Sequence, residues 1–112
     1  MQDELSDRLL EFASKIIRLT MQINKNPIGQ HIGRQIMRSA TSAGANYEEA
    51  CAGESRADFI HKLQITLKEL RESLYWLRLI KKSNLKKVDS LIDEAKELTN
   101  IIAKSILTAK KK

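Results

Sequence analysis

The chain has 112 residues, which is enough for one hydrophobic core. Its residues are 42% apolar and 30% charged, a composition typical of a globular protein. Aromatic residues make up only 4%, and four glycines with one proline are too few for a turn-rich β-protein, so the composition favours packed helices. A net charge of +6 favours an anionic partner such as nucleic acid, although such a charge can equally serve solubility alone.

The first predicted helix covers residues 3–24, where apolar residues recur every three or four positions. They are Leu5, Leu9, Phe12, Ile16, Leu19 and Ile23. Pro27 then stops this helix, and a second helix is predicted over residues 30–52. Residues 39–45 in its middle are all small, and Gly44 alone costs about 1 kcal/mol relative to alanine. We therefore expect a helix of the same bundle or of another subunit to approach closely here.

Gly53 can end the second helix in the left-handed conformation, and Ser55 followed by Asp58 resembles the capping box of a third helix over residues 56–82. The turn between these helices is short, which makes them antiparallel neighbours. A fourth helix is predicted over residues 84–109, and the basic tail, residues 110–112, is expected to be disordered. The sequence thus predicts a single domain, 1–112, with the all-α fold of an antiparallel up-and-down four-helix bundle.

No pattern in the sequence indicates an enzyme. A di-iron bundle needs a Glu-x-x-His motif on two helices, and the one comparable spacing is Asp58-x-x-His61, in which Asp58 is interpreted as a capping acid. Cys51 has no second cysteine to pair with, and the nearby Glu48 and Glu49 disfavour a reactive thiolate, so a buried, inert side chain is predicted. We expect no metal, no cofactor and no small-molecule substrate. Because no run of 18 apolar residues occurs, a cytoplasmic protein without membrane contact is expected.

The third helix carries a polar stripe with successive spacings of three and four residues. Its members are His61, Gln64, Lys68, Arg71, Tyr75, Arg78 and Lys82. A basic helix face of this kind binds phosphates without reading sequence, and a tyrosine within it can stack on a base. We predict that Lys68, Arg71, Tyr75, Arg78 and Lys82 bind nucleic acid. The alternative is an ordinary solvated helix face.

Asn46, Glu48 and Glu49 follow the run of small residues on the second helix. One interpretation is a polar network across a subunit interface, in which Arg34 or Arg38 of one copy pairs with Glu48 or Glu49 of another. The alternative is a solvated helix end.

Three segments of the chain resemble a bacterial family called the four helix bundle proteins, or 23S rRNA intervening-sequence proteins. They are IGRQIMRSATSAGANYEEA at residues 32–50, SRADFIHKL at 55–63 and KELRESLYWL at 68–77. The resemblance extends over nearly the whole chain and is most specific between Ile32 and Leu77. It implies an up-and-down bundle that assembles into a homopentamer and has no enzymatic activity.

The family is similar to the accessory variability protein of diversity-generating retroelements, a basic pentamer that works with a reverse transcriptase and RNA. The resemblance therefore makes RNA or DNA and a reverse transcriptase candidate partners. It also implies structural or interface roles at the family's recurring positions. These are Arg34, Arg38, Ser39, Ser42, Asn46, Glu49, Ser55 and Phe59. Glu49 is the acid shared with relatives that read Ile-Ala-Glu-Gly at this point.

Two functions follow from these observations. The first is a non-enzymatic oligomer that binds nucleic acid through its third helix. The second is a structural or protein-interaction bundle with no affinity for nucleic acid.

Overall fold

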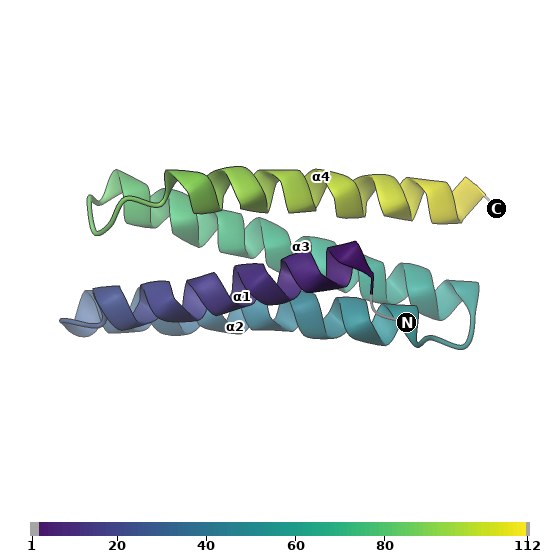
Figure 1. The fold of residues 1–112 in the computed structure, drawn as a ribbon, viewed down its shortest axis with the longest axis horizontal. Helices are drawn as coiled ribbons and strands as arrows, with labels where there is room; N and C mark the ends of the chain where they lie inside the picture. Colours follow the sequence, from purple (N-terminus) through teal and green to yellow (C-terminus); the bar gives the residue numbers. More distant parts are fainter. Residues whose placement is uncertain (1–2, 112) are drawn as a thin grey trace.

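The computed structural model describes residues 3–111, and this part of the chain folds into four helices. They are α1 (Glu4–Ile23), α2 (Pro27–Cys51), α3 (Arg56–Lys82) and α4 (Asp89–Lys111). Helices that follow one another in the chain run antiparallel and pack side by side, whereas α1 and α4 touch much less (Figure 1). The result is a rod of 47 × 20 × 19 Å, which confirms the predicted all-α, up-and-down four-helix bundle.

The core is built from the apolar seams that the heptad spacing predicted. Leu9 and Ile16 of α1 and Leu63, Leu70 and Leu77 of α3 are all at most 1% exposed. Because leucine and isoleucine fill most of the core, helices can pack closely along its whole length with very few aromatic side chains.

The start of α2 differs from the prediction. The helix begins at Pro27, not at residue 30, because the Asn26 side chain caps it by accepting a 2.9 Å hydrogen bond from the Gly29 N–H. Proline suits the first position of a helix, where its missing N–H has no intrahelical partner anyway. Pro27 therefore starts the second helix instead of merely stopping the first.

The predicted start and end of α4 were also wrong. Asn84 adopts φ 57°, and the Leu85 N–H donates to the Ile80 carbonyl at 3.1 Å, so this segment closes α3 in a Schellman-type turn. The fourth helix then begins only at Asp89. Lys110 and Lys111 of the expected disordered tail are helical, and Lys112 lies outside the described residues.

Two predictions about the end of α2 are corrected as well. Cys51 is exposed rather than buried, because it occupies the last turn of the helix. Gly53 does not adopt the left-handed conformation, and its N–H donates to the Ala50 carbonyl at 3.1 Å. The predicted cap of α3 is confirmed, since the Ser55 hydroxyl accepts a 3.1 Å hydrogen bond from the Asp58 N–H.

The small residues of α2 allow α1 to lie close to it, as expected within a bundle. A Cβ added to Gly44 would lie 3.8 Å from the Leu9 Cβ, which is an ordinary packing distance. Gly29 is under a stricter constraint, because a Cβ there would lie 1.8 Å from the Ile23 carbonyl oxygen. The turn between α1 and α2 therefore requires glycine at position 29.

Candidate nucleic-acid interface

The five residues predicted to bind nucleic acid all project from α3 into solvent. We call this set the basic stripe; it comprises Lys68, Arg71, Tyr75, Arg78 and Lys82. All five are exposed, because α3 buries the opposite face, on which the leucine seam lies. At 1.5 Å per residue, the stripe extends about 21 Å along the helix.

The four cations of the basic stripe have no carboxylate partner. None of them forms an ion pair within 4.0 Å of another described residue, whereas Lys62 and Lys81 of the same helix pair with Glu49 and Asp89. A cation without a neutralising partner remains available to a phosphate group. The stripe therefore has the charge that an anionic ligand needs.

An aromatic cluster lies beside the cations. Tyr75 is 56% exposed, and its ring meets Trp76 edge-on with 5.1 Å between the centroids. His31 of α2 meets the other side of this cluster, 6.2 Å from Trp76. Trp76 thus supports the exposed tyrosine ring from the side, which leaves a platform on which a base can stack. The contact of Trp76 with Tyr75 was not predicted from the sequence.

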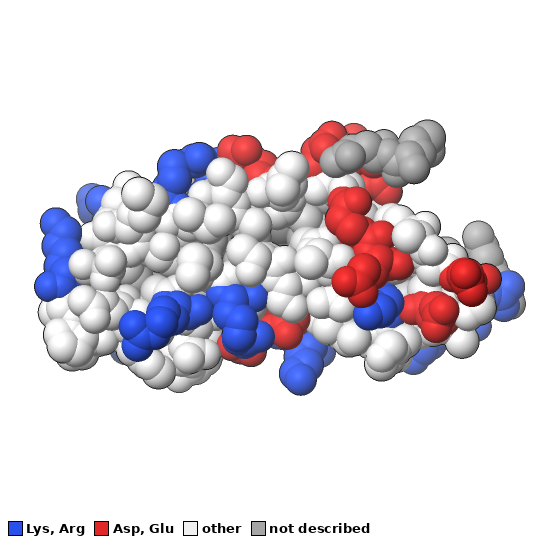
Figure 2. Space-filling model, turned by 90° about the horizontal axis from the view of Figure 1, so that it is seen from below, with Lys and Arg blue, Asp and Glu red and all other residues white. Residues whose placement is uncertain are grey.

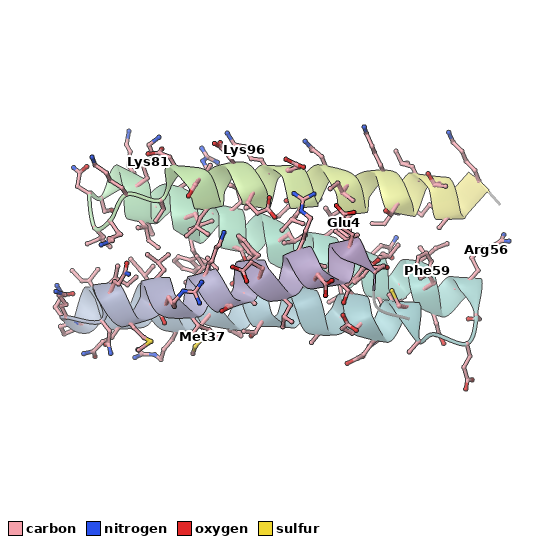
Figure 3. All side chains as sticks on the ribbon, viewed as in Figure 1. Glu4, Met37, Arg56, Phe59, Lys81 and Lys96 are labelled. Atoms are coloured by element: carbon pink, nitrogen blue, oxygen red, sulfur yellow. The ribbon has the colours of Figure 1, made fainter. Side chains whose placement is uncertain are left out.

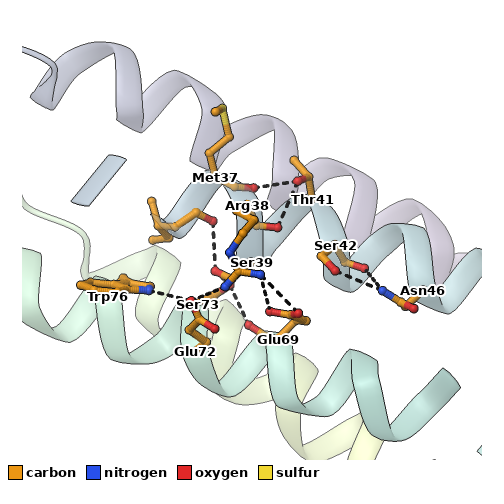
Figure 4. Close-up of polar contacts among 11 residues, drawn as sticks. Met37, Arg38, Ser39, Thr41, Ser42, Asn46, Glu69, Glu72, Ser73 and Trp76 are labelled. Carbon is orange, nitrogen blue, oxygen red and sulfur yellow. Dashed lines mark hydrogen bonds and ion pairs between the residues drawn. The ribbon is translucent and has the colours of Figure 1, made fainter. Parts of the chain in front are cut away.

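Arg38 of α2 neutralises two carboxylates next to the stripe (Figure 4). Its guanidinium lies 3.3 Å from Glu69 Oε1 and also forms an ion pair with Glu72, whose carboxylate accepts a 3.1 Å hydrogen bond from the indole N–H of Trp76. The Arg38 hydrogen bond holds the pKa of Glu72 below its usual value, despite the opposing effect of partial burial. The carboxylates of central α3 are therefore occupied, and the stripe keeps its positive charge.

Three more of the family's recurring positions form hydrogen bonds within the bundle, and one of them reaches another helix. The Ser39 hydroxyl is fully buried and lies 2.8 Å from the Ser73 hydroxyl of α3. Asn46 donates hydrogen bonds to the Ser42 hydroxyl and carbonyl on its own helix, at 3.1 and 2.9 Å. These contacts lie within one chain, so Ser39, Ser42 and Asn46 have structural roles in the bundle itself.

Ser55 and Phe59 stand at the start of α3. Ser55 caps the helix, and the half-buried Phe59 lines a cavity of about 720 Å³ between this end of α3 and the last turns of α4 (Figure 3). The cavity floor is mainly apolar, with Ile101 and Ala109 of α4 opposite Phe59. These two residues therefore lie at the opposite end of α3 from Lys82.

The structure divides the four charged residues of the proposed subunit network into two pairs. Arg38 and Glu49 are taken up within the chain, by the carboxylates of α3 and by Lys62 at 2.7 Å. Arg34 and Glu48 have no ion pair or side-chain hydrogen bond with any residue of the described chain. The residues left for an intermolecular pair are therefore Arg34 and Glu48.

Metal-ligand clusters and membrane-spanning helices are both absent from the part of the chain that the structure describes. No group of three or more His, Cys, Asp or Glu side chains within residues 3–111 is placed to hold a metal ion. Every helix in this range is too short or too polar to span a lipid bilayer.

Comparison with known proteins identifies the family. The family model described as 23S rRNA-intervening sequence protein matches residues 3–104. The chain is 37% identical to a solved protein of unknown function from the S23 ribosomal protein family of Bacteroides thetaiotaomicron, with a TM-score of 0.82 over 91% of this chain and 97% of that one. No curated protein matches. On this evidence the chain belongs to the 23S rRNA-intervening sequence protein family.

Proposed function

We propose that this protein is a non-enzymatic, cytoplasmic bundle that assembles into oligomers and binds RNA or DNA through the basic stripe of α3. The observation that carries the proposal is the set of four unpaired cations around an exposed tyrosine on one helix face. Arg38 supports this role indirectly, because it neutralises the two carboxylates that would otherwise weaken the positive potential of the stripe.

The chemistry of the stripe points to backbone recognition. Lysine and arginine on a solvent-exposed helix contact phosphates, and such contacts release counterions, so affinity falls steeply as salt rises. The stripe has one exposed aromatic ring for a base. We therefore expect binding that prefers single-stranded or irregular regions and depends little on sequence.

Charge reversal tests the proposal. Binding of a fluorescent, structured RNA is measured by anisotropy from 50 to 300 mM salt for the wild type and for a Lys68→Glu, Arg71→Glu, Arg78→Glu variant. A second variant, Lys86→Glu, Lys87→Glu, Lys96→Glu, carries the same charge change at exposed positions that do not belong to the stripe. Circular dichroism shows that both variants remain helical.

The proposal predicts that the stripe variant loses binding while the control variant keeps most of it. With three phosphate contacts removed, the slope of log affinity against log salt falls by about 2 to 3. Equal losses in the two variants would mean that net charge alone attracts RNA. No binding by the wild type would favour the structural or protein-interaction bundle.

The number of subunits and a reverse transcriptase partner are separate parts of the proposal. Five copies and that partner are implied by the family resemblance. Light scattering measures the first, and co-purification with the candidate reverse transcriptase measures the second.

A further inference from the structure

The outer surface between α1 and α2 is apolar along most of its length. We call it the α1/α2 groove. The exposed fractions of its large side chains are 66% for Leu10, 41% for Ile17, 73% for Met21 and 38% for Met37. Figure 3 shows Met37 projecting away from the bundle on this side. Monomeric proteins rarely leave such a continuous apolar strip uncovered.

Two hollows of about 370 Å³ each mark the groove along the helices. The first is lined by Met21 and Met37 together with Arg34, and the second by Leu10 and Ile17 together with Glu48. Arg34 is the only charged residue lining the first hollow, and Glu48 is the only one lining the second, among the described residues. The hollow at one end of the groove therefore contains a cation, and the hollow at the other end contains an anion.

The residues of α2 along this groove are symmetric about one position. Arg34, Met37, Thr41, Ala45 and Glu48 follow spacings of 3, 4, 4 and 3, so Arg34 and Glu48 are equally far from Thr41. The two charges are about 21 Å apart along the helix axis. Thr41 and Ala45 at the middle are small, which allows another helix to approach closely.

The charge distribution of the whole face has the same polarity. Figure 2, which views this side, shows a broad uncharged area with most blue atoms toward one end and most red atoms toward the other. In α1, the exposed acids Glu4 and Asp7 lie at the Glu48 end, next to the Tyr47–Asp3 hydrogen bond, whereas Glu11 and Lys15 line a hollow against α4. Two copies placed antiparallel would bring the acidic end of each against the basic end of the other.

We infer that the α1/α2 groove binds a second copy of this chain about a two-fold axis at Thr41. In this arrangement α2 packs antiparallel against α2 of the partner copy, and Arg34 of each chain pairs with Glu48 of the other. A two-fold contact is self-complementary, so one groove supplies both halves of the interface. It forms a dimer by itself, or joins two rings into a larger assembly, whereas closure of a five-membered ring needs a different surface.

The inference does not depend on nucleic-acid binding, because the groove and the basic stripe belong to different helices. Disulfide trapping tests the axis directly. Thr41→Cys is introduced into a Cys51→Ser background and compared with Asn100→Cys, an exposed position on α4, in the same background. Mild oxidation should link the Thr41→Cys variant into covalent dimers and leave the Asn100→Cys variant uncrosslinked.

A charge exchange tests the ion pairs. Arg34→Glu alone puts like charges together at two symmetric places, and we expect it to weaken association about tenfold or more by analytical ultracentrifugation. Arg34→Glu with Glu48→Arg in the same chain should restore it. A wild type that remains monomeric, an assembly in which Thr41→Cys does not crosslink, or a double variant no better than Arg34→Glu would each overturn the inference. Circular dichroism of every variant excludes unfolding as the cause.

Discussion

The hydroxyl oxygens of Ser39 and Ser73 lie 2.8 Å apart at the fully buried contact between α2 and α3. Each hydroxyl also lies within hydrogen-bond distance of a carbonyl on its own helix, Ile36 at 3.1 Å and Glu69 at 3.0 Å. Because a hydroxyl has one proton, one serine donates to the other, which then donates to its own carbonyl. This short relay fixes the register of the two helices.

Replacement of either serine by alanine should therefore destabilise the fold modestly. Ser39→Ala and Ser73→Ala should each lower the free energy of unfolding by about 1 kcal/mol, and the double variant by less than the sum. Urea denaturation measures these values. Ser105→Ala is the matched control, because Ser105 bonds only to the Ile101 carbonyl of its own helix. Additive losses at positions 39 and 73 would contradict the coupling.

Glu72 makes the stability depend on pH. Its pKa is lowered by Arg38 in the folded state, so its ion pair stabilises the fold fully above the ordinary value of 4.5 and less as pH falls through the folded pKa. The difference in Tm between the wild type and Glu72→Gln should be largest near neutral pH and shrink below about pH 4.5. A difference that stays constant down to pH 3 would mean that the carboxylate gains nothing from Arg38.

The fluorescence of Trp76 gives a second, independent measurement of the protonation of Glu72. Trp76 is the only tryptophan in the chain, and its indole N–H donates to Glu72. Its fluorescence should change as Glu72 takes up a proton, and the change should disappear in Glu72→Gln. A titration that survives this substitution would assign the change to another residue.

Gly29 and Gly44 should respond in opposite ways to alanine. Gly29→Ala forces a Cβ into the Ile23 carbonyl and should lower Tm strongly, because backbone must move. At Gly44 a Cβ fits, so Gly44→Ala should gain up to about 1 kcal/mol of helix propensity. Unfolding at several protein concentrations separates these effects from changes in assembly. A destabilised Gly44→Ala that shows no concentration dependence would contradict the packing described for α1.

Tyr47, near the end of α2, is hydrogen-bonded to the start of α1. Its hydroxyl donates a 2.7 Å hydrogen bond to Asp3, and the other oxygen of Asp3 caps α1 by accepting from the Ser6 N–H at 2.7 Å. The Ser6 and Tyr47 hydrogen bonds, in that order, lower the pKa of Asp3. Tyr47→Phe should cost about 1 kcal/mol and speed hydrogen exchange at the Ser6 amide. Unchanged exchange would show that the cap does not need the tyrosine.

The fold was predictable because helix periodicity directly reports which faces are buried. The seams of α1 and α3 gave nearly correct bounds, and Ser55 marked the start of α3. The starts of α2 and α4 were missed because they depend on local caps. Asn26 satisfies the first turn of α2, and Asn84 extends the end of α3 into a turn.

The exposed stripe of α3 could be placed from the sequence, but the partner of Arg38 could not be read from spacing on one helix. A usable signal was present in the short turn between α2 and α3. Residues equally distant from this turn lie near each other, as Arg38 and Glu69 do, each 13 residues from the end of its helix at the turn. Counting residues outward from the turn would have predicted that Arg38 pairs with a carboxylate of α3. Arg34 would then have remained as the arginine available to another chain.

The most direct test of the central claim is light scattering after size exclusion, with and without a structured RNA, at low and high salt. If the basic stripe binds RNA, the mass of the oligomer increases with RNA at low salt and returns to its original value at high salt. An oligomer whose mass is the same with and without RNA at every salt concentration would contradict nucleic-acid binding and make the positive charge a matter of solubility.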